Sequence, residues 1–200
     1  MRIIKLLPVL LIFSACAQNS AYLGEIQAYQ NELNEQFTDP EESPLTKEDL
    51  AGFDGLVFFP INDKFKVDAS FERITDEAPF EMPTSTDRKP IYQKYGAATF
   101  NLNNQNFTLS IYQNLALTET PGYEEYLFLP FTDASNGVST YGGGRYIELS
   151  IPDGYQIVID FNKAYNPYCA YNSRYSCPIP PKENDLDVEI LAGVMAYKEH

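Results

Sequence analysis

Hydrophobic positions recur along the chain with two different spacings. In the first part, residues 21–36 carry apolar side chains at intervals of three or four, namely Leu23, Ile26, Tyr29 and Leu33. This spacing puts them on one face of a helix, so we predict an amphipathic helix there. A second short helix is expected within residues 43–50, with Thr46 as its cap. Residues 21–50 are therefore predicted to be a helical segment.

From residue 51 onward, apolar and polar positions alternate with a period of two, which is typical of strands. Segments rich in β-branched and aromatic residues lie at 56–59, 65–71, 91–102, 107–112, 125–130, 145–150, 156–161 and 186–191. The polar run 103–106 tolerates positive φ and predicts a tight hairpin between two of them. Because long helices do not alternate with these strands, we expect one mainly β domain over residues 51–200. Its antiparallel sheet is expected to curl into a barrel or roll.

The first sixteen residues have the pattern of an export signal. Arg2 and Lys5 precede eight apolar residues, 6–13, and then comes Phe13-Ser14-Ala15-Cys16. A membrane span needs roughly 20 apolar residues, so this stretch is too short to be one. Small residues before a cysteine resemble the bacterial lipobox, in which the cysteine is acylated. We predict a signal peptide over 1–15 and a lipidated tether over 16–20, starting at Cys16; an ordinary cleaved signal is the alternative.

The charge of the chain limits its partners. It has 14 basic and 28 acidic residues, a net charge of −14. Such a surface repels phosphate backbones and anionic lipid, so we expect no nucleic-acid partner and contact with the membrane only through the lipid anchor. The single histidine, His200, is the last residue, which disfavours catalytic triads and histidine metal sites. We expect no metal and no cofactor.

Two cysteines remain once Cys16 is assigned to lipid. Cys169 and Cys177 would close a nine-residue loop, and an even number of cysteines in an exported protein favours a disulfide. Chain entropy makes such a short bridge worth roughly 2–3 kcal/mol. If reduced, the two thiols could instead bind a soft metal or act as redox partners.

The most unusual composition lies in residues 141–175. Seven of the fifteen tyrosines fall there, together with three asparagines. Rings with hydroxyls and amides can line a pocket that stacks a ligand and recognises its polar edges. The candidate ligand-binding residues are Tyr141, Arg145, Tyr146, Asp160, Asn162, Tyr165, Asn166, Tyr171 and Asn172. The alternative is structural, because tyrosine is also a good strand residue.

Three glycines, 142–144, precede Arg145. The spacing matches no phosphate-binding loop, and a strand follows instead of a helix. We therefore favour a turn in which Arg145 pairs with an internal carboxylate such as Asp160 or Glu148.

Three motifs carry a family resemblance: GGGRYI at 142–147, FNKAYNPYCAYN at 161–172 and CPIPPKEN at 177–184. Together they resemble the bacterial and archaeal family called domain of unknown function 1684, over about residues 91–193. The resemblance implies one shared domain. It implies no activity, cofactor or catalytic residue.

Three functional hypotheses follow. We favour a lipid-anchored, non-catalytic protein of the bacterial cell envelope, on the periplasmic or outer-membrane side, whose tyrosine-asparagine face binds a small molecule or another envelope protein. The alternative is a glycosidase-like hydrolase using Asp160 and Glu183 as its two carboxylates. Under the third hypothesis, residues 141–175 are purely structural.

Overall fold

A computed structural model describes the backbone of residues 12–197 and the side chains of residues 20–197. Two α-helices come first, α1 (Ile12–Thr38) and α2 (Lys47–Ala51). The strands are β1 (Lys66–Arg73), β2 (Phe80–Glu81), β3 (Ile91–Leu102), β4 (Gln105–Asn114), β5 (Tyr126–Asp133), β6 (Arg145–Ser150), β7 (Gln156–Asp160) and β8 (Asp185–Leu186). Short 3₁₀ turns are η1 (Asp63–Phe65), η2 (Leu117–Glu119), η3 (Phe161–Lys163), η4 (Tyr168–Ala170) and η5 (Lys182–Asn184). Residues 1–11 of the predicted signal peptide lie outside the described residues, residues 12–15 are described only as backbone at the start of α1, and the side chain of Cys16 is not described.

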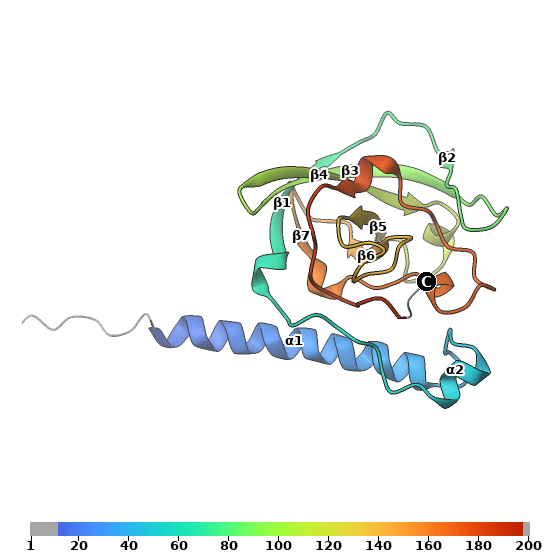
Figure 1. The fold of residues 1–200 in the computed structure, drawn as a ribbon. Helices are drawn as coiled ribbons and strands as arrows, with labels where there is room; N and C mark the ends of the chain where they lie inside the picture. Colours follow the sequence, from blue (N-terminus) through green and yellow to red (C-terminus); the bar gives the residue numbers. More distant parts are fainter. Residues whose placement is uncertain (1–11, 198–200) are drawn as a thin grey trace, which may run out of the picture.

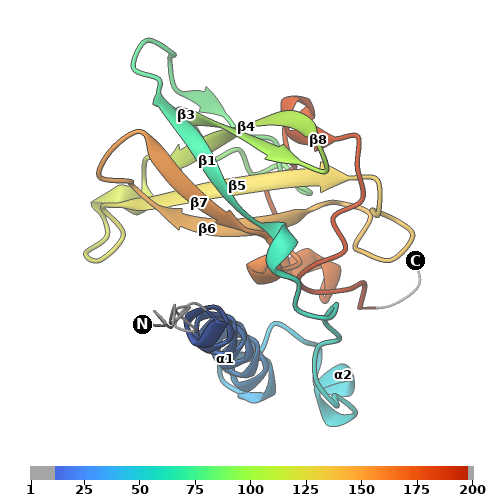
Figure 2. The ribbon, with the colours of Figure 1, turned by 90° about the vertical axis from the view of Figure 1, so that its left-hand side faces the viewer.

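The strands form one curled sheet, with the order β6-β5-β4-β3-β1-β7. Neighbours along this path are antiparallel; β2 pairs with β3, and β8 pairs in parallel with β5. The sheet curls into a half-barrel, and α1 lies outside it, along the side of β6 and β7 (Figures 1 and 2). The predicted mainly β, antiparallel architecture with a helical segment before it is confirmed.

The hairpin between β3 and β4 forms where the polar run predicts it. Asn103 and Asn104 have φ of 52° and 63°, the left-handed values that asparagine tolerates best among residues with a Cβ. Leu102 and Gln105 pair across this two-residue turn, and the register continues to Tyr92 and Asn114 with one bulge near Gly96. The turn therefore fixes the register of the two longest strands.

Alternation along the strands creates two apolar layers. The inner layer fills the half-barrel with side chains such as Leu109, Ile111, Leu129 and Ile147, all of them buried. The opposite face of β3 to β6 carries a second, aromatic layer of Tyr92, Tyr112, Phe128 and Tyr146, with Met82 from the segment that covers it. Both faces of these strands are therefore occupied, and the aromatic layer brings tyrosines to the outer face.

Helix α1 begins at Ile12 and ends at Thr38, so it extends beyond both ends of the predicted range. Asp39 and Pro40 follow, and the proline ring cannot continue a helix. Phe37 packs edge-on against Tyr171 at 4.7 Å between ring centroids, in a third cluster with Leu45 and Leu56. Thr46 caps α2 as predicted, accepting a hydrogen bond from the backbone of Asp49 at 3.1 Å. No helix in the described part of the chain is both long and apolar enough to cross a bilayer.

Two predicted strands are wrong. Residues 56–59 form only an isolated bridge between Phe58 and Val194, and the predicted strand 186–191 is reduced to the end of β8. The backbone of residues 190–192 bonds to side chains instead of a strand: Ile190 donates to Asp133 at 3.1 Å and accepts from Arg145 at 2.7 Å. Hydrogen bonds to polar side chains thus take the place of the strand pairing that the apolar pattern predicted.

Candidate functional site

The candidate site lies on the outer face of β6, beside α1. Tyr146 and Glu148 point to this face, because Ile147 between them points into the half-barrel core. The segment after β7 returns along the free edge of β6, where Tyr146 and Tyr165 exchange two backbone hydrogen bonds of 2.9 and 3.0 Å. This bridge places the Tyr165 ring against Tyr146, and α1 covers it from the other side.

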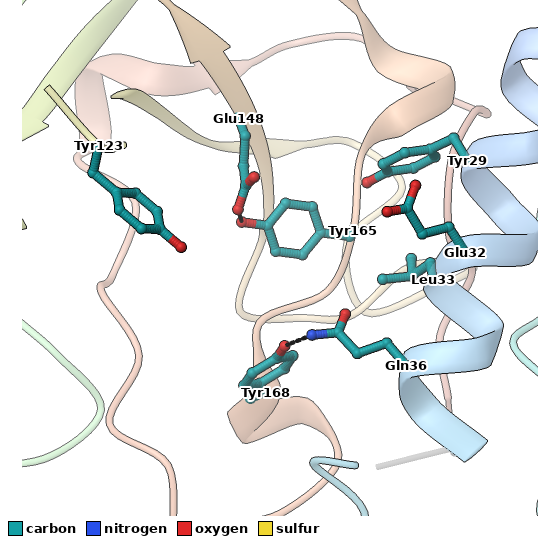
Figure 3. Close-up of a pocket in the computed structure, with 8 residues that line it drawn as sticks. All are labelled: Tyr29, Glu32, Leu33, Gln36, Tyr123, Glu148, Tyr165 and Tyr168. Atoms are coloured by element: carbon teal, nitrogen blue, oxygen red, sulfur yellow. Dashed lines mark hydrogen bonds between the residues drawn. The ribbon is translucent and has the colours of Figure 1, made fainter. Parts of the chain in front are cut away.

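We call the cavity between α1 and β6 the tyrosine pocket; its volume is about 540 Å³. It is lined by Tyr29, Glu32, Leu33, Gln36, Tyr123, Glu148, Tyr165 and Tyr168. Figure 3 shows four side chains of α1 on one side, Tyr165 and Tyr168 facing them, and the Glu148 carboxylate beside the Tyr165 hydroxyl. Four tyrosine rings and two carboxylates therefore surround one space.

Hydrogen bonds hold the walls of this pocket in place. Tyr165 Oη donates to Glu148 Oε1 at 3.0 Å, and Tyr126 Oη donates to the same oxygen at 3.4 Å. On the helix side, Tyr29 Oη donates to the carbonyl of Lys163 at 2.9 Å. Gln36 Nε2 donates to Tyr168 Oη at 3.0 Å (Figure 3). Helix α1 is thereby fixed to the segment after β7 along the rim of the pocket.

The tyrosine hydroxyls remain protonated donors. Burial raises the pKa of Tyr165 well above its usual value, and the nearby tyrosine and glutamate groups raise it further. Burial also raises the pKa of Tyr126 and of Tyr29, in both cases with Glu148 as the next contributor. These groups therefore donate hydrogen bonds to Glu148 and to the backbone throughout the physiological range.

Two further pockets adjoin the tyrosine pocket. The cysteine-side pocket, of about 330 Å³, shares Glu148, Tyr165 and Tyr168 with it and extends to Tyr146 and Cys177. The seam pocket, of about 290 Å³, lies where the edges of β6 and β7 approach, and it also includes Glu148. Glu148 thus lines all three spaces.

Some of the residues predicted from sequence meet here and some do not. Tyr165 lines the tyrosine pocket, Tyr146 the cysteine-side pocket and Asp160 the seam pocket. Tyr141 is half-buried, and burial raises its pKa to about 12. Asn172 lies in a turn, where its Oδ1 accepts from the backbone of Arg174 at 3.2 Å. Only part of the predicted face therefore belongs to the pockets.

Arg145 was predicted as a ligand-binding residue, but it lines none of these three pockets. Its side chain is fully buried, and Nη2 donates to Asp133 Oδ2 at 2.8 Å and to the carbonyl of Ile190. Nη1 donates to the carbonyl of Ala192. A carboxylate partner was expected, but it is Asp133 at the end of β5 and neither Asp160 nor Glu148. The Arg145 side chain therefore links β6 to the end of β5 and to the C-terminal segment.

Three more predicted ligand-binding residues are buried and serve the fold. Asn162 exchanges hydrogen bonds of 3.0 and 2.9 Å with the backbone of Asn62. Asn166 Nδ2 donates to the carbonyl of Met195 at 2.8 Å. Tyr171 lies in the cluster beneath α1. At these positions the side chains make contacts within the fold, in keeping with the structural alternative.

The carboxylates of the hydrolase hypothesis are not brought together. Asp160 Oδ1 accepts a hydrogen bond from the backbone N–H of Asn162 at 3.0 Å, which caps η3, and it also accepts one from Tyr22 Oη. Glu183 pairs with Lys94 at 2.9 Å and accepts from Tyr112, in a different pocket. The hydrogen bond from Lys94 lowers the pKa of Glu183, whereas a general acid needs a raised pKa.

Cys169 and Cys177 do lie side by side. The backbone N–H of Cys169 points to Cys177 Sγ at 3.0 Å, and both cysteines are free thiols in the structure. The disulfide remains a prediction. Within the described residues, no three metal-ligating side chains gather at one place.

Sequence reasoning missed most of the pocket walls. Tyr29 and Leu33 were recognised as the apolar stripe of a helix, and Glu148 only as a partner for Arg145. The alternation that pairs Glu148 with Tyr146 on one face was available as a signal. The approach of α1 to residues more than a hundred positions later left no signal in the sequence.

Comparison with known proteins identifies the family of the chain. A solution NMR structure of an uncharacterized protein of Haloarcula marismortui is similar, with a TM-score of 0.71 and 30% sequence identity, covering 92% of this chain and 99% of that one. No curated protein matches. A family model described as a protein of unknown function, DUF1684, matches residues 51–195. The chain belongs to the DUF1684 family, which confirms the resemblance suspected from the sequence.

Proposed function

We propose that this protein is a lipid-anchored binding domain of the bacterial cell envelope, and that it binds a small molecule non-covalently in the tyrosine pocket. The observation that carries the binding function is a cavity of about 540 Å³ walled by four tyrosine rings. Small-molecule pockets commonly measure about 300–1,000 Å³ and combine aromatic walls with a few polar groups.

The walls of the pocket are fixed in advance, which favours binding. Tyr29 comes from α1, Tyr123 from the loop before β5, and Tyr165 and Tyr168 from the segment after β7. Hydrogen bonds at Tyr29, Tyr165 and Tyr168 already hold three of these side chains. A ligand that enters a preformed site loses less free energy to the ordering of side chains.

Binding is a better proposal than hydrolysis. The two carboxylates of the pocket, Glu32 and Glu148, lie on opposite elements, α1 and β6. Glu148 accepts hydrogen bonds from two tyrosine hydroxyls. The two carboxylates predicted for a hydrolase, Asp160 and Glu183, line other pockets than this one.

The binding site is tested by a fragment screen on the protein with isotope-labelled tyrosine rings, observed by NMR. We expect hits that shift the ring signals of Tyr165 and Tyr168. Leu33→Trp, which fills the pocket, should abolish these shifts. The matched control is Val138→Trp, because Val138 is 82% exposed and lines none of the three pockets. A library of cations, anions and neutral compounds that moves none of these rings would overturn the proposal.

The anchor is proposed from the sequence and has its own test. The support is the charged start, the eight-residue apolar stretch and the small residues before Cys16. Intact mass spectrometry of the protein from its native membrane should show a chain that lacks residues 1–15 and carries acyl groups. An unprocessed chain would refute the anchor and leave the pocket proposal standing.

A further inference from the structure

We infer that the ligand of the tyrosine pocket is an organic cation, an alkylammonium compound whose charged head lies between Glu148 and the tyrosine rings. This inference depends on the proposed function, because it assigns a chemical class to the ligand of the same pocket.

The charge of the pocket lining is the first argument. The lining includes two carboxylates, Glu32 and Glu148, and no lysine or arginine. Within residues 20–197, neither carboxylate forms an ion pair. An anionic ligand would meet like charges here, whereas a cation would meet opposite charges in a partly desolvated space.

Two lysines share a pocket with Glu148, and both are engaged with other groups. Lys66 and Lys163 line the seam pocket, which also includes Glu148. Lys163 Nζ lies 2.6 Å from Glu25 Oε1, and Lys66 Nζ lies over the Tyr22 ring, 4.6 Å from its centroid. The side of Glu148 that faces the tyrosine pocket therefore keeps its charge available for a ligand.

The hydrogen bonds of Glu148 leave one oxygen for that ligand. Tyr165 and Tyr126 both donate to Oε1. In the described part of the chain, Oε2 receives no hydrogen bond. Two donors on one oxygen orient the carboxylate, and the second oxygen can accept from an ammonium N–H or lie against a methylated ammonium group.

The rings supply the second attraction. A cation over the face of a tyrosine ring is attracted by the quadrupole of the ring, and cages of aromatic rings recognise methylated ammonium groups. Tyrosine rings already attract cations within this molecule: Arg73 lies 3.6 Å from the centroid of Tyr95, and Arg174 lies 4.7 Å from that of Tyr175. Four rings next to a carboxylate combine both attractions in one cavity.

The size of the site indicates a ligand with a tail. The tyrosine pocket holds more than an ammonium head, and the cysteine-side pocket continues it past Tyr165 and Tyr168. Tyr92, Phe128 and Tyr146 line that continuation. The ligand class is therefore an ammonium compound with a short apolar or hydroxylated chain.

The test compares probes of similar size and different charge. Choline and butylammonium are the cations, 3,3-dimethylbutan-1-ol is the uncharged isostere of choline, and 3,3-dimethylbutyrate is the anion. Each is titrated into the full protein while the tyrosine ring signals are followed by NMR. We expect a cation to shift Tyr165 and Tyr168, and the uncharged isostere to bind at least ~10-fold more weakly, the ratio given by one charged contact.

Variants locate the charge that is recognised. Glu148→Gln should weaken cation binding by ~10-fold more than it weakens binding of the uncharged isostere, so that the two probes bind about equally. The matched control is Glu72→Gln, an exposed glutamate of β1 that lines none of the three pockets. Thermal unfolding of each variant establishes that the fold is intact.

The outcomes separate this inference from the proposed function. Equal shifts of Tyr165 and Tyr168 by choline and its uncharged isostere would overturn the cation and leave a binding pocket. Pocket hits in the fragment screen that are anionic or neutral, with no response to either cation, would do the same. A pocket that responds to no compound of any class would remove both proposals.

Discussion

The buried ion pair between Arg145 and Asp133 leads to the sharpest prediction on stability. Both side chains are fully buried, and Asp133 also accepts from the backbone of Ser135 at 2.9 Å and of Ile190 at 3.1 Å. Asp133→Asn keeps an acceptor for the backbone donors but removes the charge that compensates Arg145. Breaking a buried ion pair by removing one partner costs about 3–5 kcal/mol, because it leaves an uncompensated charge.

The expected effect can be measured as a melting temperature. For a domain of this size, 1 kcal/mol corresponds to about 2–4 °C, so Asp133→Asn should lower Tm by ~6–20 °C. Urea unfolding followed by far-ultraviolet circular dichroism gives the free energy directly. Burial lowers the pKa of Arg145, but a guanidinium is basic enough to stay protonated without a carboxylate partner. In the variant, the buried Arg145 guanidinium therefore keeps its charge without a carboxylate partner at any pH of the experiment.

An exposed ion pair provides the control. Lys89 and Glu81 lie 3.3 Å apart with 61% of each side chain exposed, and such pairs contribute at most about 1 kcal/mol. Lys89→Gln should therefore leave the unfolding curve nearly unchanged. Combining Asp133→Asn with Arg145→Met should destabilise less than the sum of the two single changes. If Asp133→Asn unfolds within about 1 kcal/mol of wild type, the reasoning on the unpaired charge is refuted.

Three further predictions concern single side chains. Asn184, fully buried, bridges β4 and β5 through three hydrogen bonds of 2.7–2.8 Å, so Asn184→Ala should cost about 2–4 kcal/mol in urea unfolding; a loss below about 1 kcal/mol would contradict this. The neighbouring Cys177 thiol lowers the pKa of Cys169 to about 7, so iodoacetamide should alkylate Cys169 first in the reduced protein, and equal labelling rates would argue against it. The hydrogen bond from Lys94 lowers the pKa of Glu183, so the ionised carboxylate stabilises the fold. This stabilisation is fully present above the pKa that Glu183 has in the unfolded chain, and it is lost as the pH falls through the lower pKa of the folded protein. The melting temperature of Glu183→Gln should therefore fall less than that of wild type between about pH 5 and about pH 3. Equal falls for the two proteins would refute the assignment.

Local patterns in the sequence predicted most of the sheet. The predicted bounds 91–102 and 145–150 are those of β3 and β6, because aromatic and β-branched residues favour strands locally. The turn at Asn103 and Asn104 follows from the backbone freedom of asparagine. The pattern failed at 186–191, where Arg145 and Asp133 bond to the backbone in place of a strand.

The candidate site was predicted only in part, because its walls come from distant segments. Tyr165 was expected to bind a ligand, and it lines the tyrosine pocket. Tyr29 faces the same space from α1, and only the docking of that helix brings it there. Arg145 was misassigned because its partner, Asp133, lies across a turn in another strand. Whether such a residue binds a ligand or supports the fold depends on its burial. The spacing of residues along the sequence does not show that burial.

Strand β6 couples the stability of the protein to its chemistry. Arg145 and Glu148 lie three positions apart on this strand, on opposite faces. A slip of the strand by one residue would turn Glu148 into the apolar interior and move the guanidinium away from Asp133. The buried ion pair therefore works as a register pin, since only one alignment satisfies it. Substitutions that loosen this pin should disturb the geometry of the pocket from inside the half-barrel without touching any residue that lines it.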